Sequence, residues 1–319
     1  MIAQTAADET TPVGTGEAAV DPITSIGDLL GDDLGASVVF FGVTLALAIL
    51  GFTFLALRLL YRSTPQVGLP RPRWGVGEVL FAFAMWLVVQ TAFVAASTKL
   101  LTLFTGAGGI HWLDLGAWTG NPIELSIRLT ALGIGGLAFA GVLLIIPRIV
   151  EQPLTVLGIG TGSIAQGFAG AILVGLTIIP AALVVALLWQ ITLFAFGVEP
   201  TPQEVVEEFS RAIGGNGTSL VAAIAFLTVV VAPITEELLF RAVLFRWLQT
   251  EMPTWGAVIL SGVIFSLCHF SLTAFLPLAL LGILFAVILH RTGNLWACIA
   301  LHALFNGTNL LLMAAAQLL

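Results

Sequence analysis

Residues 219–248 read SLVAAIAFLTVVVAPITEELLFRAVLFRWL, which is long and apolar enough to cross a bilayer as a helix. The stretch nonetheless contains two adjacent glutamates, Glu236 and Glu237, and an arginine, Arg241. Ionisable side chains are costly in hydrocarbon, so within a spanning helix they indicate a functional site by default. This part of the sequence therefore predicts a membrane-spanning helix that carries chemistry.

The composition of the whole chain is that of a membrane protein. Of its 319 residues, 58% are hydrophobic and 9% are charged, and the mean hydropathy is +1.07. A soluble domain is about half apolar and about a quarter charged. Seven of the 18 acidic residues lie in the first 35 positions, and no cluster of lysine and arginine indicates a nucleic-acid partner. We therefore expect a multi-pass integral membrane protein that does not bind nucleic acid.

Apolar segments of spanning length recur along the chain. We count eight candidates, at 37–60, 77–104, 125–147, 166–196, 219–248, 255–270, 272–290 and 294–317. The fourth must tilt or break near Pro180, and the sixth is too short to require a complete crossing. The prediction is an all-α, polytopic transmembrane bundle of about eight helices. We expect a disordered acidic tail over 1–36, about four transmembrane helices over 37–197, and a catalytic core of four helices over 219–317.

The basic residues of the short loops predict how the chain is oriented. Most of them fall on one side of the membrane if the N-terminus lies outside: Arg58, Arg62, Arg71, Arg73, Arg148, Arg246 and Arg291. Because basic loops stay in the cytoplasm, we predict an external N-terminus. Eukaryotic targeting signals are lacking, which favours a bacterial cell membrane.

Two later segments add polar residues at helical i,i+4 spacing. His269 follows Phe265 by four positions, and Asn306 follows His302 by four. At a rise of about 1.5 Å per residue, both histidines and Asn306 lie near the mid-depth of their segments, as Glu236 does. These side chains can therefore meet within the bilayer.

The residue types suit hydrolysis of a peptide bond. That reaction needs a base to activate water, an acid for the leaving amine, and donors for the developing oxyanion. A desolvated glutamate such as Glu236 is suited to act as base and then as acid. His269 can hold the same water. His302 and Asn306 offer two donors on one helix face, so the four residues are together sufficient for catalysis.

The other polar residues have simpler interpretations. Glu237 and Arg241 predict an i,i+4 ion pair that organises the site without direct catalysis. Phe265 is expected to pack beside His269. The two cysteines, Cys268 and Cys298, are read as small buried hydrophobes and not as a disulfide. Pro233 should kink or start a helix.

A metal site is the alternative to metal-free catalysis. Glu236, His269 and His302 meet the count of three protein ligands plus water that a catalytic zinc ion needs. No cofactor is favoured on the residues alone, and zinc stays open.

The three motifs together resemble a known family. EExxxR (Glu236 to Arg241), FxxxH (Phe265 to His269) and HxxxN (His302 to Asn306), in this order on successive helices, are similar to the CAAX-protease and bacteriocin-processing (CPBP) family. That family includes CAAX prenyl endopeptidases and the bacterial Abi-type proteins. The resemblance covers roughly residues 219–313.

The resemblance implies a role for each motif residue. Glu236 and His269 would activate water, His302 and Asn306 would stabilise the oxyanion, and Glu237 and Arg241 would complete the first motif. The family has been described both as metalloproteases and as glutamate proteases. We favour the second description, because asparagine is a poor zinc ligand and a good oxyanion donor.

The leading hypothesis is an intramembrane endopeptidase that cuts a membrane-tethered protein or peptide, with membrane lipid as its surroundings. Whether that substrate is prenylated stays open. A non-enzymatic bacteriocin-immunity or scaffolding protein is the alternative. A proton-coupled transporter is a third reading, which the lack of related halves disfavours.

Overall fold

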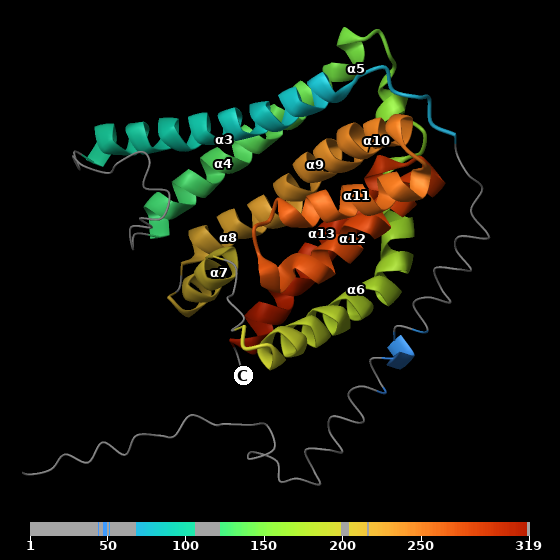
Figure 1. Ribbon diagram of the computed structural model, residues 1–319. Helices are drawn as coiled ribbons and strands as arrows, with labels where there is room; N and C mark the ends of the chain where they lie inside the picture. Colours follow the sequence, from blue (N-terminus) through green and yellow to red (C-terminus); the bar gives the residue numbers. More distant parts are fainter. Residues whose placement is uncertain are drawn as a thin grey trace, which may run out of the picture. The chain divides into compact units, whose positions relative to one another are not determined.

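The apolar segments of the chain fold into helices in the computed structural model, and no strand occurs in the part of the chain that it describes (Figure 1). The structure describes residues 44, 47–49, 51, 68–105, 122–198, 204–215 and 217–317. Six helical stretches in these ranges are long and apolar enough to cross a membrane: Val76–Lys99, Leu125–Ile149, Ile164–Phe194, Thr218–Glu251, Leu272–Thr292 and Leu295–Ala316. The predicted fold class, a polytopic helical bundle, is confirmed.

The described helices follow one another in a fixed order along the chain. The first half of the described chain contains α3 (Val76–Thr105), α4 (Pro122–Leu143), α5 (Ile146–Ile149), a 3₁₀ turn η1 (Leu154–Leu157) and α6 (Ile164–Ala195). The second half contains α7 (Glu204–Gly214), α8 (Thr218–Phe226), the π-helical segment η2 (Leu227–Val231), α9 (Ala232–Glu236), the π-helical segment η3 (Glu237–Phe245), α10 (Arg246–Glu251), α11 (Thr254–Leu267), α12 (Leu272–Thr292) and α13 (Leu295–Ala316).

The expected spans compare with these helices as follows. The expected span 37–60 lies almost entirely outside the described residues. The sixth expected span, 255–270, is the short helix α11 of 14 residues, which is below spanning length. Helix α6 continues through Pro180 for 32 residues without a break, and its axis bends (Figure 1). The predicted domain boundaries stay predictions.

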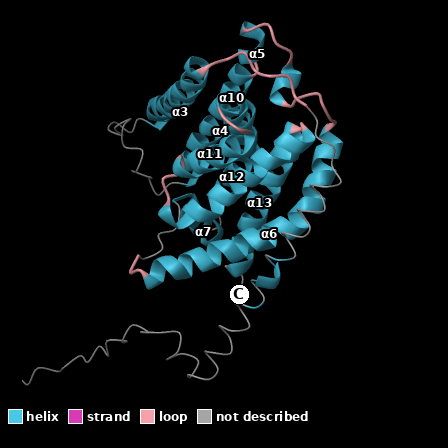
Figure 2. Cartoon of the chain, turned by 45° about the vertical axis from the view of Figure 1, so that its right-hand side comes forward, coloured by secondary structure: helices cyan, strands magenta, loops and turns pink. Residues whose placement is uncertain are grey.

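The stretch from α8 to α10 is surrounded by the other helices of residues 49–319, which form one compact unit. Helix α4 packs against α3 on one side and α8 on the other, and α6 packs against both α12 and α13. Helices α11 and α12 also pack closely, as Figures 1 and 2 show from two directions. The π-helical segment η3 contacts α3, α4, α11, α12 and α13. The polar motif at its start is therefore enclosed by the bundle.

A pair of glycines allows α11 to approach α12. A Cβ atom added to Gly262 would meet the backbone nitrogen of Ile283 at 2.6 Å, and one added to Gly282 would meet the Cα of Gly262 at 2.8 Å. Small residues of this kind let membrane helices pack with their backbones in contact. The close packing fixes the end of α11, after which His269 follows.

The long helix Thr218–Glu251 contains two π-helical segments, η2 and η3, where the sequence predicted only a kink at Pro233. Such segments are rare and occur mostly at functional sites. Side chains from elsewhere in the bundle bond two carbonyl groups of η3. Trp74 donates its indole N–H to the carbonyl of Val243 at 3.2 Å, and the Ser261 hydroxyl donates to that of Phe240 at 3.4 Å. Packing therefore supports the π-helical geometry.

Candidate active site

The structure brings the five ionisable motif residues to one place in the bundle. Glu236 ends α9, and Glu237 begins η3 one residue later. His269 follows the end of α11, while His302 and Asn306 lie in α13. Segments that are more than 60 residues apart in sequence thus meet at the junction of α9 and η3.

Glu237 is the buried centre of the site. Its Oε2 lies 3.0 Å from Nε of Arg241, which is the ion pair that their spacing predicts, and both side chains are fully buried. Its Oε1 lies 2.9 Å from Nδ1 of His302. An ionised carboxylate can only accept hydrogen bonds, so the His302 Nδ1–H must donate here. The pairing of Glu237 with His302 was not foreseen from the sequence.

Aromatic rings enclose the Arg241 guanidinium and the His302 imidazole. The guanidinium carbon of Arg241 lies 4.2 Å from the ring centre of Phe265 and 5.1 Å from that of Phe285. Cation–π contacts of this kind gain strength when the cation is desolvated. The Phe285 ring also stacks on His302 at 5.3 Å, with 24° between the planes. Phe285 lies outside the three motifs, and nothing in its local sequence identifies it.

Both histidines direct the same ring atom at one carboxylate oxygen. Nδ1 of His269 donates to the carbonyl of Phe265 at 2.8 Å, which fixes the ring and leaves Nε2 facing the site. Nε2 of His269 lies 3.7 Å from Oε2 of Glu236, and Nε2 of His302 lies 3.9 Å from the same oxygen. In the neutral rings these nitrogens are acceptors, so a proton or a water molecule between them and the carboxylate would satisfy all three atoms.

Exposure divides the site into a closed side and an open side. The side chains of Glu236 and His269 are 23% and 25% exposed, whereas that of His302 is 6% exposed. The open side continues onto an apolar surface at the end of α11, where Phe270 is 95% exposed. Phe270 also adopts a positive φ of 49°, a backbone conformation that is uncommon for a bulky residue. Glu236 and His269 therefore form the more exposed side of the site, although Oε2 of Glu236 is itself buried.

Asn306 bonds a backbone carbonyl in this structure. Its Nδ2 donates to the carbonyl of Thr228 at 2.9 Å. In η2 the N–H of Ala232 bonds the carbonyl of Leu227, five residues earlier. In the same register, the N–H of residue 233 would bond the carbonyl of Thr228. Residue 233 is a proline and has no N–H. Asn306 therefore supplies the hydrogen bond that Pro233 cannot, and its predicted place in an oxyanion hole stays a prediction.

Replacing Asn306 by alanine should destabilise the protein by about 1–3 kcal/mol, because the Thr228 carbonyl then loses this side-chain donor. The loss should shrink when Pro233→Ala is added, since residue 233 then has an N–H to offer. Thermal unfolding of the two single variants and the double variant measures this coupling. Strictly additive losses would show that Asn306 does not replace the missing N–H.

The same experiment separates structure from catalysis. If Asn306 also stabilises an oxyanion, Pro233→Ala should restore the stability of Asn306→Ala but not its activity. Recovery of both would make Asn306 a purely structural residue.

The donor set is chemically suited to zinc, but its spacing is wide. Two donors on one tetrahedral zinc ion lie about 3.3 Å apart, given bonds of about 2.0–2.2 Å. The distances from Glu236 Oε2 to the two Nε2 atoms are 3.7 and 3.9 Å. Among the residues that the structure describes, no group of three His, Cys, Asp or Glu side chains has the arrangement of a metal site. Metal dependence is therefore a question for a chelator.

The two cysteines lie apart from each other in the described bundle. Both are free; Cys298 is buried and donates to the carbonyl of Phe285 at 3.3 Å, while Cys268 is partly buried. Their interpretation as small apolar residues agrees with these positions.

The fold and the site define a class of protein: a multi-pass membrane protein with a carboxylate–histidine site enclosed by its spanning helices. Comparison with known protein families is more specific for one part of the chain. Residues 218–308 match the sequence model of the family described as type II CAAX prenyl endopeptidase Rce1-like. This match confirms the resemblance that the three motifs indicate.

One curated relative is similar over part of the chain. The chain is 34% identical over 77 residues to the Bacillus subtilis (strain 168) protein named "Putative membrane peptidase YdiL". The similar region is 24% of this chain and 32% of that protein, so the chain spans about a third of the length of the relative it matches. No solved structure matches the chain significantly.

Proposed function

We propose that this protein is an intramembrane endopeptidase that hydrolyses a peptide bond with a water molecule activated by Glu236 and His269. The observation that carries the proposal is the convergence of the two histidine Nε2 atoms on Oε2 of Glu236, inside an apolar bundle. The match of residues 218–308 to an endopeptidase family supports the same reaction class.

The reaction begins with a water molecule between Glu236 and His269. Glu236 takes one of its protons as the water oxygen attacks the carbonyl carbon of the scissile bond. The carbonyl oxygen becomes an oxyanion, and protonated Nε2 of His302 donates to it. When the carbon–nitrogen bond breaks, Glu236 returns its proton to the leaving amine, so the carboxylate is regenerated.

Glu237 prepares His302 for this role. Because Glu237 accepts from Nδ1, only Nε2 of His302 is left to face the substrate. Glu237 thus fixes which ring nitrogen of His302 is directed at the position of the oxyanion. Asn306 has a second Nδ2–H besides the one it gives to Thr228, and that group is the second candidate donor.

The substrate we propose is a protein or peptide tethered to the membrane. The open side of the site borders an exposed apolar surface that includes Leu267, Phe270 and Leu272. A lipid-anchored chain can approach along such a surface without leaving the bilayer. A prenylated C-terminus is one anchor that fits, and it is the one that the family description names. We propose a bacterial cell membrane as its location, because eukaryotic targeting signals are lacking, and the distribution of its arginines supports an external N-terminus.

Cleavage of a membrane-anchored peptide library by the purified protein in lipid tests the proposal. We expect discrete cut sites with the wild type and none with His269→Gln, which excludes a contaminating protease. A chelator should leave cleavage unchanged if water is activated by Glu236 and His269 alone. If the chelator abolishes cleavage and added zinc restores it, Glu236, His269 and His302 would instead be the ligands of a catalytic zinc ion.

The test can also contradict the whole proposal. Absence of cleavage by a folded wild-type protein, across anchors with and without a prenyl group, would favour a non-enzymatic immunity or scaffolding role.

A further inference from the structure

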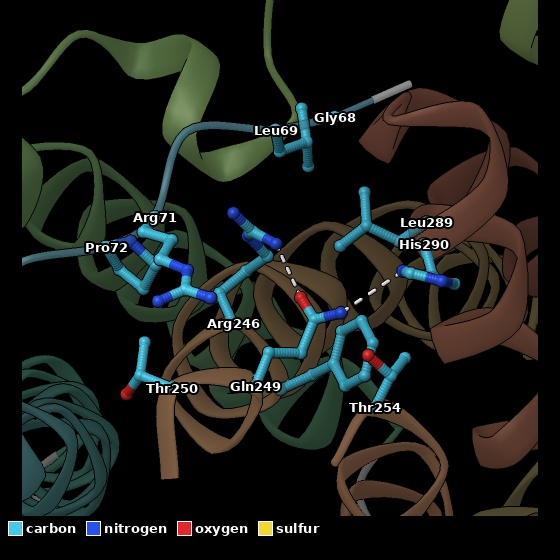
Figure 3. A pocket seen from close by; sticks show the side chains of 11 residues that line it. Gly68, Leu69, Arg71, Pro72, Arg246, Gln249, Thr250, Thr254, Leu289 and His290 are labelled. Atoms are coloured by element: carbon cyan, nitrogen blue, oxygen red, sulfur yellow. Dashed lines mark hydrogen bonds between the residues drawn. The ribbon is translucent and has the colours of Figure 1, made fainter. Parts of the chain in front are cut away.

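A polar pocket lies away from the glutamate–histidine site, at one end of the bundle (Figure 3). It has a volume of about 220 Å³. Its walls come from the segment before α3, from η3 and α10, from the start of α11 and from the end of α12. The lining residues are Gly68, Leu69, Arg71, Pro72, Phe245, Arg246, Gln249, Thr250, Thr254, Leu289 and His290.

The ionisable side chains that line the pocket are all basic. Two arginines and a histidine line it, together with an amide and two hydroxyl groups, and none of its eleven lining residues is acidic. Figure 3 shows the Arg71 and Arg246 side chains beside each other, with Gln249 and His290 across from them. Two guanidinium groups that line one pocket repel each other, so an anion bound in the pocket would lower its energy.

Arg246 is held rigidly in this pocket. It is 7% exposed, and its guanidinium donates to the carbonyls of Val156 and Pro70 and to the side chain of Gln249. Gln249 in turn bonds Nδ1 of His290 at 3.2 Å. A guanidinium has five N–H donors, so these three bonds leave two for a ligand. Such a fixed fork matches the geometry of phosphate oxygens.

The pocket lies at the depth of a lipid headgroup. It is built at the ends of two spans, Thr218–Glu251 and Leu272–Thr292, and just before the span that begins at Val76. Phosphate groups of a bilayer lie beyond the hydrocarbon core, where spanning helices end. Arg71 and Arg246, which are among the arginines that predict the cytoplasmic side, are at this end, and the cytoplasmic leaflet is rich in anionic lipid.

We propose that this pocket binds the phosphate group of an anionic phospholipid. Arg71 and Arg246 pair with the phosphate oxygens, and the hydroxyl group of Thr254 offers a further donor. The acyl chains of the lipid then lie along the apolar surfaces of the spanning helices. The site is independent of the proposed peptidase reaction, and its occupancy can be measured without any substrate.

Binding of a labelled phosphatidylglycerol to the protein in phosphatidylcholine nanodiscs tests the site. We expect saturable binding that weakens about tenfold or more in Arg71→Gln, since a charge-assisted hydrogen bond is lost. Arg73→Gln is the matched control: it removes the same charge two residues away, from an exposed arginine that does not line the pocket. It should bind as the wild type does. Unchanged thermal unfolding of both variants, measured without the label, shows that the fold is intact.

The arms of the experiment separate the sources of phosphate. Weak competition by inorganic phosphate would support a lipid ligand, because the acyl chains contribute to its affinity. Inorganic phosphate could instead displace the labelled lipid completely, and bind equally well in nanodiscs of pure phosphatidylcholine. That result would assign the pocket to a free phosphate compound and contradict the proposal of a lipid ligand. Equal losses in Arg71→Gln and Arg73→Gln would show general electrostatic attraction and overturn the pocket altogether.

Discussion

Glutamine in place of Glu236 should lower kcat/KM for peptide cleavage by about 10²–10⁴-fold, the range attributed to one general acid–base residue. The amide has nearly the shape of the acid, but it cannot take the proton of the attacking water. Glu236 lies where both histidine Nε2 atoms converge, and no other carboxylate in the described part of the chain is placed to substitute for it. Glu237 is occupied by Arg241 and His302.

Initial rates on a cleaved library peptide measure this effect. The matched control is Glu251→Gln, which makes the same change at an exposed glutamate near the end of the same helical run. It should leave the rate unchanged. Glu236 is not the base if Glu236→Gln retains more than about a tenth of the wild-type rate and unfolds at the same temperature, because a general base contributes about 10²–10⁴-fold.

Arg241→Ala should destabilise the folded protein by about 3–5 kcal/mol, because it leaves the buried Glu237 carboxylate without its cation. The variant also removes a guanidinium that packs between the rings of Phe265 and Phe285. Denaturant unfolding in detergent micelles, followed by helix content, measures the loss. Arg148→Ala is the control, since Arg148 is exposed, and it should unfold like the wild type.

A compensated variant tests the cause of that loss. Arg241→Met combined with Glu237→Gln removes both charges and keeps most of the packing volume. It should regain much of the stability that Arg241→Ala loses, because replacing a buried ion pair by groups of similar volume is often neutral. Its peptidase activity should still be low, since His302 would lose the carboxylate that orients it. A double variant as unstable as Arg241→Ala would mean that packing of the guanidinium, and not charge balance, holds the site.

Much of the site was predictable because its residue types are so unusual where they occur. Glu236, Glu237, Arg241, His269 and His302 stand out in apolar segments, and the structure brings them together. Their partners were harder to foresee. Phe285 is an ordinary apolar residue in sequence, and it is recognised only by its contacts with Arg241 and His302.

The contact of Asn306 shows how a local pattern can mislead about partners. Its spacing from His302 suggested two donors on one helix face, and the structure instead directs one Asn306 donor to the carbonyl of Thr228, 78 residues away. The cause is the coincidence of a π-helical register with Pro233 on another helix. Neither feature can be read from the segment that contains Asn306.

The sequence by itself determined the membrane-spanning segments, the i,i+4 ion pair of Glu237 with Arg241, and the residue types available for catalysis. Hydrophobic length and helical spacing are local properties, so each can be read within one segment. Only the tertiary structure decided that Glu237 orients His302, that both histidines face Glu236, and that Arg71 and Arg246 share a pocket. These contacts join distant segments, and the packing of complete helices fixes which side chains meet.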